Sequence, residues 1–404
     1  MKRLFYNRVF LILFPILVWQ LYAYTLIPTV ICKMAGFLGT FLLLILGGKQ
    51  FFNGLFSRDT IKTTISLIIL CAFITWFTSL VFWNQNFLAS FRGSSIVLSL
   101  VFFFYLVNGK FSKQDIIRMV IILGILYTLL WIYAILSSPK IIFGYIGTLD
   151  SDEYVINRGL ARIELNGTNF QVLLYFYALV ESYVSRKKLL WIPFTFILFI
   201  FTCASMTRFK IAVIILVTLY FILFRVSLNF KKVFLGILGI LLLFGIVDHF
   251  LHDYVEILTG LTTSQFSGKI SKEDDGMYRI KEYIFYFRDF KNNFITMILG
   301  NGFPNSSSLE NYINLLKIKG YYPDDVAYAA VYIYMGFWGL YLYFKLFWTL
   351  VKQKVSQNMD FAKLGILFIV LSSFTLMNVF DSIAIATCSY LIFIDKFQKK
   401  GIVK

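Results

Sequence analysis

The chain has 404 residues, of which 59% are hydrophobic and only 15% are charged, and its mean hydropathy is +0.76. An ordinary soluble domain has about 25% charged residues, so this composition excludes a soluble globular protein and indicates an integral membrane protein. The formal net charge of +17 does not require a nucleic-acid partner, because basic residues gather at cytoplasmic span ends and beside anionic lipid headgroups.

Apolar stretches long enough to cross about 30 Å of hydrocarbon as helices recur along the whole chain. They lack the alternating pattern of barrel strands, so we predict an all-α polytopic membrane helix bundle. Twelve spans are predicted, near residues 9–27, 30–47, 63–83, 90–108, 116–136, 168–184, 189–206, 209–224, 233–250, 326–350, 361–379 and 382–395.

These spans divide the chain into N-terminal helices over residues 1–250, a long loop over 251–325 and C-terminal helices over 326–404. Most of the 38 Lys and Arg residues fall in the segments that are cytoplasmic if the N-terminus is cytoplasmic. The positive-inside rule therefore places both termini in the cytoplasm and the long loop outside.

Basic residues left on the outer side are exceptions to this rule, and they come in pairs: Arg158 with Arg162, Arg208 with Lys210, and Arg279 with Lys281. The spans near 168 and 209 begin on that same side, so their unpaired backbone N–H groups point outward beside these cations. Cations and helix N-termini together favour a phosphate or diphosphate. The alternative is that these side chains snorkel to outer lipid phosphates.

The long loop contains a helix predicted from residue 278 to 297. Its apolar residues recur at helical spacing on one face: Ile280, Tyr283, Ile284, Phe287 and Phe294. We expect this amphipathic helix to lie on the membrane or to act as a lid; the alternative is an ordinary helix packed on the bundle. The following Gly300 and Gly302 predict a turn rather than a phosphate-binding P-loop.

Two adjacent carboxylates, Asp324 and Asp325, follow Pro323 and open the next span on the outer side. One of them is expected to cap the helix. The other is then available as a general base, because a carboxylate at an apolar boundary has a raised pKa. Base and helix cap remain alternatives for Asp325.

The twelve predicted spans, the long outer loop before the tenth span and the Arg residues at outer helix ends together resemble Wzy-type polysaccharide polymerases and the related O-antigen ligases. The ligase pattern has a His, a small polar residue, nine further residues and Gly-x-x-Gly. Here Asp325 and Val326 take the first two places, residues 327–335 fill the nine, and Gly336-Phe-Trp-Gly339 completes the pattern. Asp in place of the His departs from the ligases and suits the polymerases, in which that position is more variable.

Three further stretches carry the same resemblance: "RGLARIELNGTNF" at 158–170 at the entry to the sixth span, "SMTR" at 205–208, and "YRIKEYIFYFRDF" followed by "ILGNGF". The resemblance implies a fold of the GT-C glycosyltransferase type in the bacterial cytoplasmic membrane. It also implies transfer of a nascent glycan from undecaprenyl diphosphate to the sugar end of another lipid-linked repeat unit, outside the cytoplasm. Besides this substrate and membrane lipids, a chain-length regulator protein is an expected partner.

Under this hypothesis Asp325 is the base, and Arg208 and Arg279 stabilise the leaving diphosphate. The residues expected to bind the diphosphate or the glycan are Arg158, Arg162, Lys210, Lys281, Asn169 and Asp324. No cofactor and no metal are expected. The Asp150-Ser-Asp152 and His249/His252 spacings are better explained by an acidic loop and by interfacial histidines.

Two other functions remain as alternatives. A flippase or exporter of lipid-linked oligosaccharide would also bind diphosphate, but transporters usually carry ionisable groups near the bilayer midplane and have related halves. The middles of these spans are nearly free of charge, which favours chemistry at the outer face. A glycan ligase of the same fold is the nearer alternative, and only the missing His argues against it.

Overall fold

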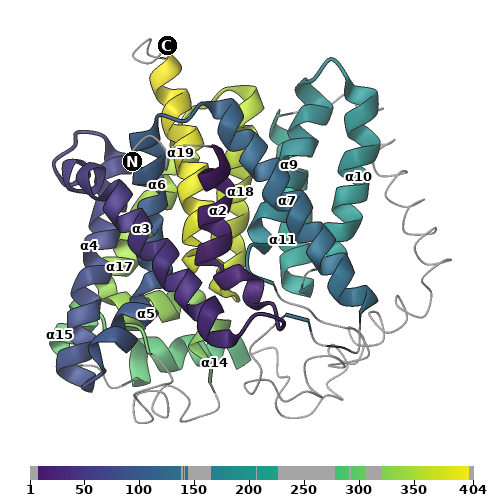
Figure 1. Cartoon of the computed structure of the whole chain (residues 1–404). Coiled ribbons are helices and arrows are strands. Elements are labelled where there is room, and N and C mark those ends of the chain that lie inside the picture. The colour runs from purple at the N-terminus through teal and green to yellow at the C-terminus, as the bar shows by residue number, and fades with distance from the viewer. Residues whose placement is uncertain are drawn as a thin grey trace.

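The computed structural model describes residues 8–137, 140, 142–143, 165–205, 207–225, 278–290, 293–304 and 321–399. They form a bundle of helices (Figure 1), in chain order α2 (Arg8–Val18), α3 (Thr29–Leu55), α4 (Thr60–Trp83), α5 (Phe87–Leu98), α6 (Phe102–Gly109), α7 (Lys113–Leu136), α9 (Thr168–Val184), α10 (Lys188–Ala204), α11 (Arg208–Arg225), α14 (Tyr278–Ile284), α15 (Phe294–Leu299), α17 (Ala327–Lys352), α18 (Asp360–Ser372) and α19 (Ser382–Lys399). Short 3-10 or π turns are η1 (Gln20–Ala23), η2 (Ser99–Val101), η4 (Phe285–Asp289), η5 (Pro323–Asp325), η6 (Gln357–Met359) and η7 (Met377–Phe380). The described residues contain no β-strand, so the predicted all-α class is confirmed.

Among the described residues, four stretches are long and apolar enough to cross a membrane: α3, α4, the joined α5–η2–α6 stretch from Phe87 to Gly109, and α7. This finding fits a helical membrane protein. The other described helices are shorter or more polar, and the predicted span 233–250 lies outside the described residues. A helix occupies at least part of every other predicted span.

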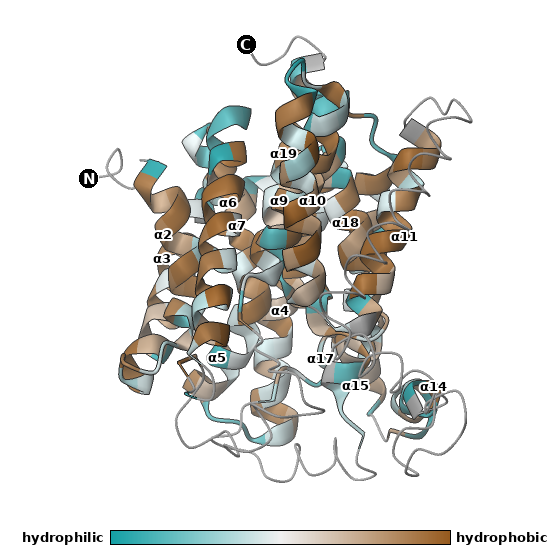
Figure 2. Cartoon of the chain, turned by 90° about the vertical axis from the view of Figure 1, so that its right-hand side faces the viewer, coloured by the Kyte–Doolittle hydropathy of each residue, from teal (hydrophilic) through white to brown (hydrophobic). Residues whose placement is uncertain are grey.

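The bundle has buried inner helices and apolar outer ones. Side chains are almost wholly enclosed over residues 102–106 of α6 and 383–393 of α19, whereas Leu189 of α10 and Phe224 of α11 are 87% and 73% exposed. Brown, hydrophobic residues cover the helices through the middle of the bundle, and hydrophilic residues gather toward its ends (Figure 2). Contiguous apolar surface of this kind is expected where helices face lipid.

Two ion pairs hold the C-terminal part of α19 against neighbouring helices. The buried carboxylate of Asp395 pairs with Lys113 at the start of α7, and Lys396 pairs with Asp59 at 2.6 Å. Asp59 also caps α4, because its Oδ1 accepts the N–H groups of Ile61 and Lys62. The C-terminal helix is thereby tied to the first turns of two N-terminal helices.

The first predicted span is too long. α2 ends at Val18, and Gln20, Leu21, Tyr22 and Ala23 all have φ between 49° and 58°, the left-handed region. The chain therefore turns back at residues 20–23 to pack α3 against α2, rather than continuing helically to Pro28. Four successive non-glycine residues in this region are uncommon, and propensity alone does not predict them.

The amphipathic helix predicted over 278–297 is broken, and a different face is buried. A π turn follows α14, and α15 begins only at Phe294. Glu282 and Tyr286 are wholly buried, whereas Phe287 and Phe294 of the expected apolar face are 44% and 74% exposed. That exposure fits a helix lying on the membrane. The prediction missed the break after the π turn, which adds a residue to the helical repeat, and the buried partners of Glu282.

α2 begins and α19 ends at one end of the bundle, and α14 and α15 lie at the opposite end (Figures 1 and 2). Part of the predicted loop is not a surface loop: α15 packs against α4 and α17, and Asn301 and Phe303 beyond it are buried. This arrangement brings the loop helix α14 next to the start of α17.

Candidate functional site

The centre of the candidate site is an arginine shared by two carboxylates, which we call the Arg279 cluster (Arg279, Glu282 and Asp325). The Nη1 atom of Arg279 lies 2.8 Å from Glu282 Oε2 and also forms an ion pair with Asp325 Oδ2. Glu282 is wholly buried, whereas Asp325 is 35% and Arg279 42% exposed. The two residues predicted to act as base and diphosphate ligand are thus in direct contact.

Two elements far apart in sequence position this cluster. Arg279 and Glu282 lie one turn apart on α14, and Asp325 ends η5, just before α17. The turn is closed by the Asp325 N–H, which donates to Tyr322 O at 3.1 Å. α17 begins after Val326, which supplies no capping side chain. The carboxylate of Asp325 therefore faces α14.

Burial and hydrogen bonding act against each other on Glu282. Removal from water raises the pKa of this carboxyl, and the nearby Asp325 adds to that rise. Hydrogen bonds from Arg279 and from the Tyr322 N–H oppose it. Burial lowers the pKa of Arg279, but hydrogen bonds to the same two carboxylates and their charges outweigh this effect and raise it, so the guanidinium stays a cation at this place.

A second polar group, which we call the Asp381 cluster (Asn169, Lys210 and Asp381), joins two more of the predicted residues. Asn169 is buried, and its Nδ2 donates to Asp381 Oδ2 at 2.7 Å. Oδ1 of the same carboxylate accepts the Ala384 N–H at 3.1 Å and so caps α19. Lys210, in the first turn of α11, is near enough for its positive charge to act on Asp381.

One segment borders both clusters, namely the connector over residues 373–381 between α18 and α19. Tyr283, next to Glu282 on α14, donates its hydroxyl to Phe374 O at 2.7 Å. Tyr328 of α17 packs edge-on against the Phe374 ring, with 5.1 Å between ring centroids. Asp381 forms the other end of the connector. Both clusters therefore lie along one connector of the bundle.

The glycines of the predicted turn fix the loop against a break in α17. Gly336 has φ 69° and ψ −176°, which interrupts that helix. Backbone N–H groups of Asn301 and Gly302 donate to Ile333 O and Tyr334 O at 2.8 and 3.0 Å. Gly300, which ends α15, and Gly302 have φ of 89° and 83°, a backbone conformation that favours glycine. Gly336 of the Gly-x-x-Gly motif thus makes the break in α17, and the carbonyl groups just before the break bind the 300–303 segment.

The other predicted site residues are placed less fully. Arg208 begins α11 and Asp324 lies in η5, but their side chains are not described. Lys281 is exposed on α14, and Arg158 and Arg162 lie outside the described residues.

Sequence reasoning missed two carboxylates, Glu282 and Asp381. The spacing of Glu282 three residues after Arg279 is a signal for pairing on a helix. Asp381, directly before the last predicted span, had the position of a helix cap. Neither signal indicates the distant partners that the carboxylates acquire.

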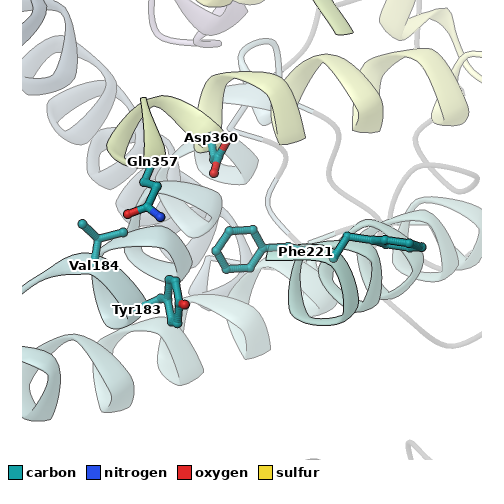
Figure 3. A pocket seen from close by; sticks show the side chains of 6 residues that line it. Tyr183, Val184, Phe221, Gln357 and Asp360 are labelled. Atoms are coloured by element: carbon teal, nitrogen blue, oxygen red, sulfur yellow. The ribbon is translucent and has the colours of Figure 1, made fainter. Parts of the chain in front are cut away.

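A small hollow of about 110 Å³ lies elsewhere, lined by Tyr183, Val184, Phe221, Phe224, Gln357 and Asp360. The rings of Tyr183 and Phe221 and the Asp360 carboxylate surround it (Figure 3). It is formed by the last turns of α9 and α11, whereas Asn169 and Lys210 lie in their first turns. None of the predicted site residues lines this hollow.

Within the described ranges, no three His, Cys, Asp or Glu side chains gather as metal ligands. Asp150, Asp152, His249 and His252 lie outside those ranges. The absence of a metal or cofactor from the reaction stays a prediction. No protein-family model matches the sequence, and no curated protein is significantly similar to it.

Proposed function

We propose that this protein is a membrane glycosyltransferase that polymerises oligosaccharide repeat units carried on undecaprenyl diphosphate. The observation that carries the proposal is the contact of Arg279 with Asp325, at the end of the bundle opposite the start of α2 and the end of α19. A carboxylate beside a fixed guanidinium offers a base and an anion ligand within one site.

In the proposed reaction, Asp325 accepts the proton of an acceptor sugar hydroxyl. The hydroxyl oxygen forms the new bond to the anomeric carbon of the donor glycan, and the bond from that carbon to the diphosphate oxygen breaks. The diphosphate keeps the electron pair and leaves as an anion held by Arg279, with Arg208 and Lys210 as further cations. A guanidinium suits this role because its donors match phosphate oxygens in pairs.

The membrane arrangement belongs to the same proposal: twelve spans of the GT-C type, both termini cytoplasmic, the site outside, and a chain-length regulator as partner. Single cysteines at Lys281 and at Lys110 test the orientation with a membrane-impermeant thiol reagent on intact cells. Labelling of position 281 but not of 110 is expected. The reverse pattern would place the Arg279 cluster in the cytoplasm and refute the extracytoplasmic reaction.

The activity is tested by incubating the purified protein, in detergent or nanodiscs, with the lipid-linked repeat unit of cells lacking the protein. A ladder of longer glycans on a gel is expected, and heat-inactivated protein is the control. A deletion strain separates the alternatives. If the deletion leaves single repeat units on the surface lipid, the protein is a polymerase. Repeat units trapped inside the cell would indicate a flippase, and long chains left on undecaprenyl diphosphate would indicate a ligase.

A further inference from the structure

The position of Arg279 cannot be set by its own helix. α14 has only 7 residues, and helices shorter than about 12 residues are marginal in water on their own. Its place must come from tertiary contacts. Two of these are the Tyr283 hydroxyl on Phe374 O and the Phe285 ring 5.3 Å from that of Tyr321.

The third contact is Glu282, and it acts on the arginine directly. Both of its carboxylate oxygens are used: Oε2 accepts Arg279 Nη1 at 2.8 Å, and Oε1 accepts the Tyr322 N–H at 3.1 Å. One side chain thus joins the arginine to the backbone three residues before Asp325. Removing an ionised carboxylate from water costs free energy, so the buried Glu282 carboxylate is stable only while it is paired and hydrogen-bonded.

We propose that Glu282 is a positioning residue: its buried ion pair keeps Arg279 oriented toward the substrate. Arg279 exchanges only its other partner, Asp325, for the diphosphate. The inference rests on the proposed function. Asp325 is 35% exposed and Glu282 is wholly enclosed, so an incoming anion reaches the arginine on the side of Asp325. The buried pair keeps the guanidinium in place while the exposed pair opens.

The test compares Glu282→Gln with a matched control, Asp289→Asn. Glutamine keeps the size and an acceptor for the Tyr322 N–H but removes the charge that holds Arg279. Asp289 lies in the same segment and pairs with Arg288 at 2.8 Å, but both residues are exposed. Loss of an exposed ion pair is worth little, so Asp289→Asn should behave as the wild type.

Glu282→Gln should lower kcat for ladder formation by about 10- to 100-fold, the loss expected for one charge-assisted hydrogen bond. KM should change by less than about threefold, since the binding groups remain. A purely structural role would instead lower the melting temperature and the amount of active protein, with kcat per folded molecule unchanged. That outcome, or equal losses in both variants, refutes the inference.

A second measurement does not depend on the reaction. Phenylglyoxal modification of Arg279, followed by peptide mass spectrometry, should be faster in Glu282→Gln, and hydrogen exchange of the 321–325 amides should rise. Asp289→Asn should alter neither. If the wild type forms no ladder but these changes appear, the proposed function fails and the positioning contact stands. Unchanged modification and exchange overturn the positioning role itself.

Discussion

Replacement of Gly336 by alanine should detach the 300–303 segment from α17. At φ 69° and ψ −176° the backbone is in a region open essentially only to glycine, which costs another residue about 1–3 kcal/mol. The added Cβ would lie 2.2 Å from Ile298 O and 2.6 Å from Gly300 N. Both are backbone atoms, so the segment itself must move.

That movement breaks the hydrogen bonds from Asn301 N to Ile333 O and from Gly302 N to Tyr334 O. Each is worth about 0.5–1.5 kcal/mol, which with the strain gives a total loss of about 2–6 kcal/mol. Unfolding entropy of about 2.1 cal/mol/K per residue gives a chain of 404 residues a shift of about 1 °C per kcal/mol, so the melting temperature should fall by at least about 2 °C.

The assay is thermal unfolding of the purified protein, with Gly48→Ala as control. Gly48 lies within α3, and a Cβ there would meet nothing within 4 Å. Alanine favours a helix by about 1 kcal/mol over glycine, so this variant should melt at the wild-type temperature or above. If Gly336→Ala also melts there, the described break in α17 and the docking of the 300–303 segment are wrong.

Three further predictions concern charged groups. Asp325→Asn should slow ladder formation by about 100-fold or more if Asp325 is the base. The melting temperature should be nearly unchanged, because Arg279 still pairs with Glu282. A wild-type rate would show that Asp325 takes no part in the reaction. Lys113→Met should lower the free energy of unfolding by about 3–5 kcal/mol, because it removes the Lys113 cation from the Asp395 carboxylate, which is 1% exposed. An unchanged melting temperature would contradict this ion pair. Burial raises the pKa of Glu282, which faces Arg279 and Asp325, so in the folded protein this carboxylate takes up a proton at a higher pH than a free glutamate does. As the pH falls, Glu282 should become protonated and release Arg279 at a pH above the ordinary pKa of glutamate. The pH–rate profile of the wild type should therefore show a fall in rate at that pH, and the profile of Glu282→Gln should lack it.

The sequence predicted helices well where the signal is local. Hydropathy over a window of about 20 residues marks an apolar helix whatever it packs against, and α4, α7 and α9 lie where they were expected, whereas α3 continues to Leu55, past the predicted end at 47. The first span failed because four residues adopt a left-handed backbone. The loop helix over 278–297 is interrupted after a π turn, and neither event has a strong local signature.

Residue chemistry also marked parts of the candidate site from the sequence alone. Arg279 and Lys210 were selected as basic residues on the expected outer side, Asn169 through the family resemblance, and Asp325 as a carboxylate at an apolar boundary. Which of them meet is a different matter. Asn169 contacts Asp381 across 212 positions of the chain, and no periodicity reports such a pairing.

The sequence by itself thus determined the membrane class, most of the helical ranges and the residue types able to bind an anion, because composition and periodicity express local free energies of transfer and of helix formation. Only the tertiary structure decided that Arg279 is shared by Glu282 and Asp325, and that α17 breaks at Gly336 to receive the 300–303 segment. These contacts depend on how whole helices pack, and a buried charge or a free carbonyl takes whichever partner that packing brings within reach.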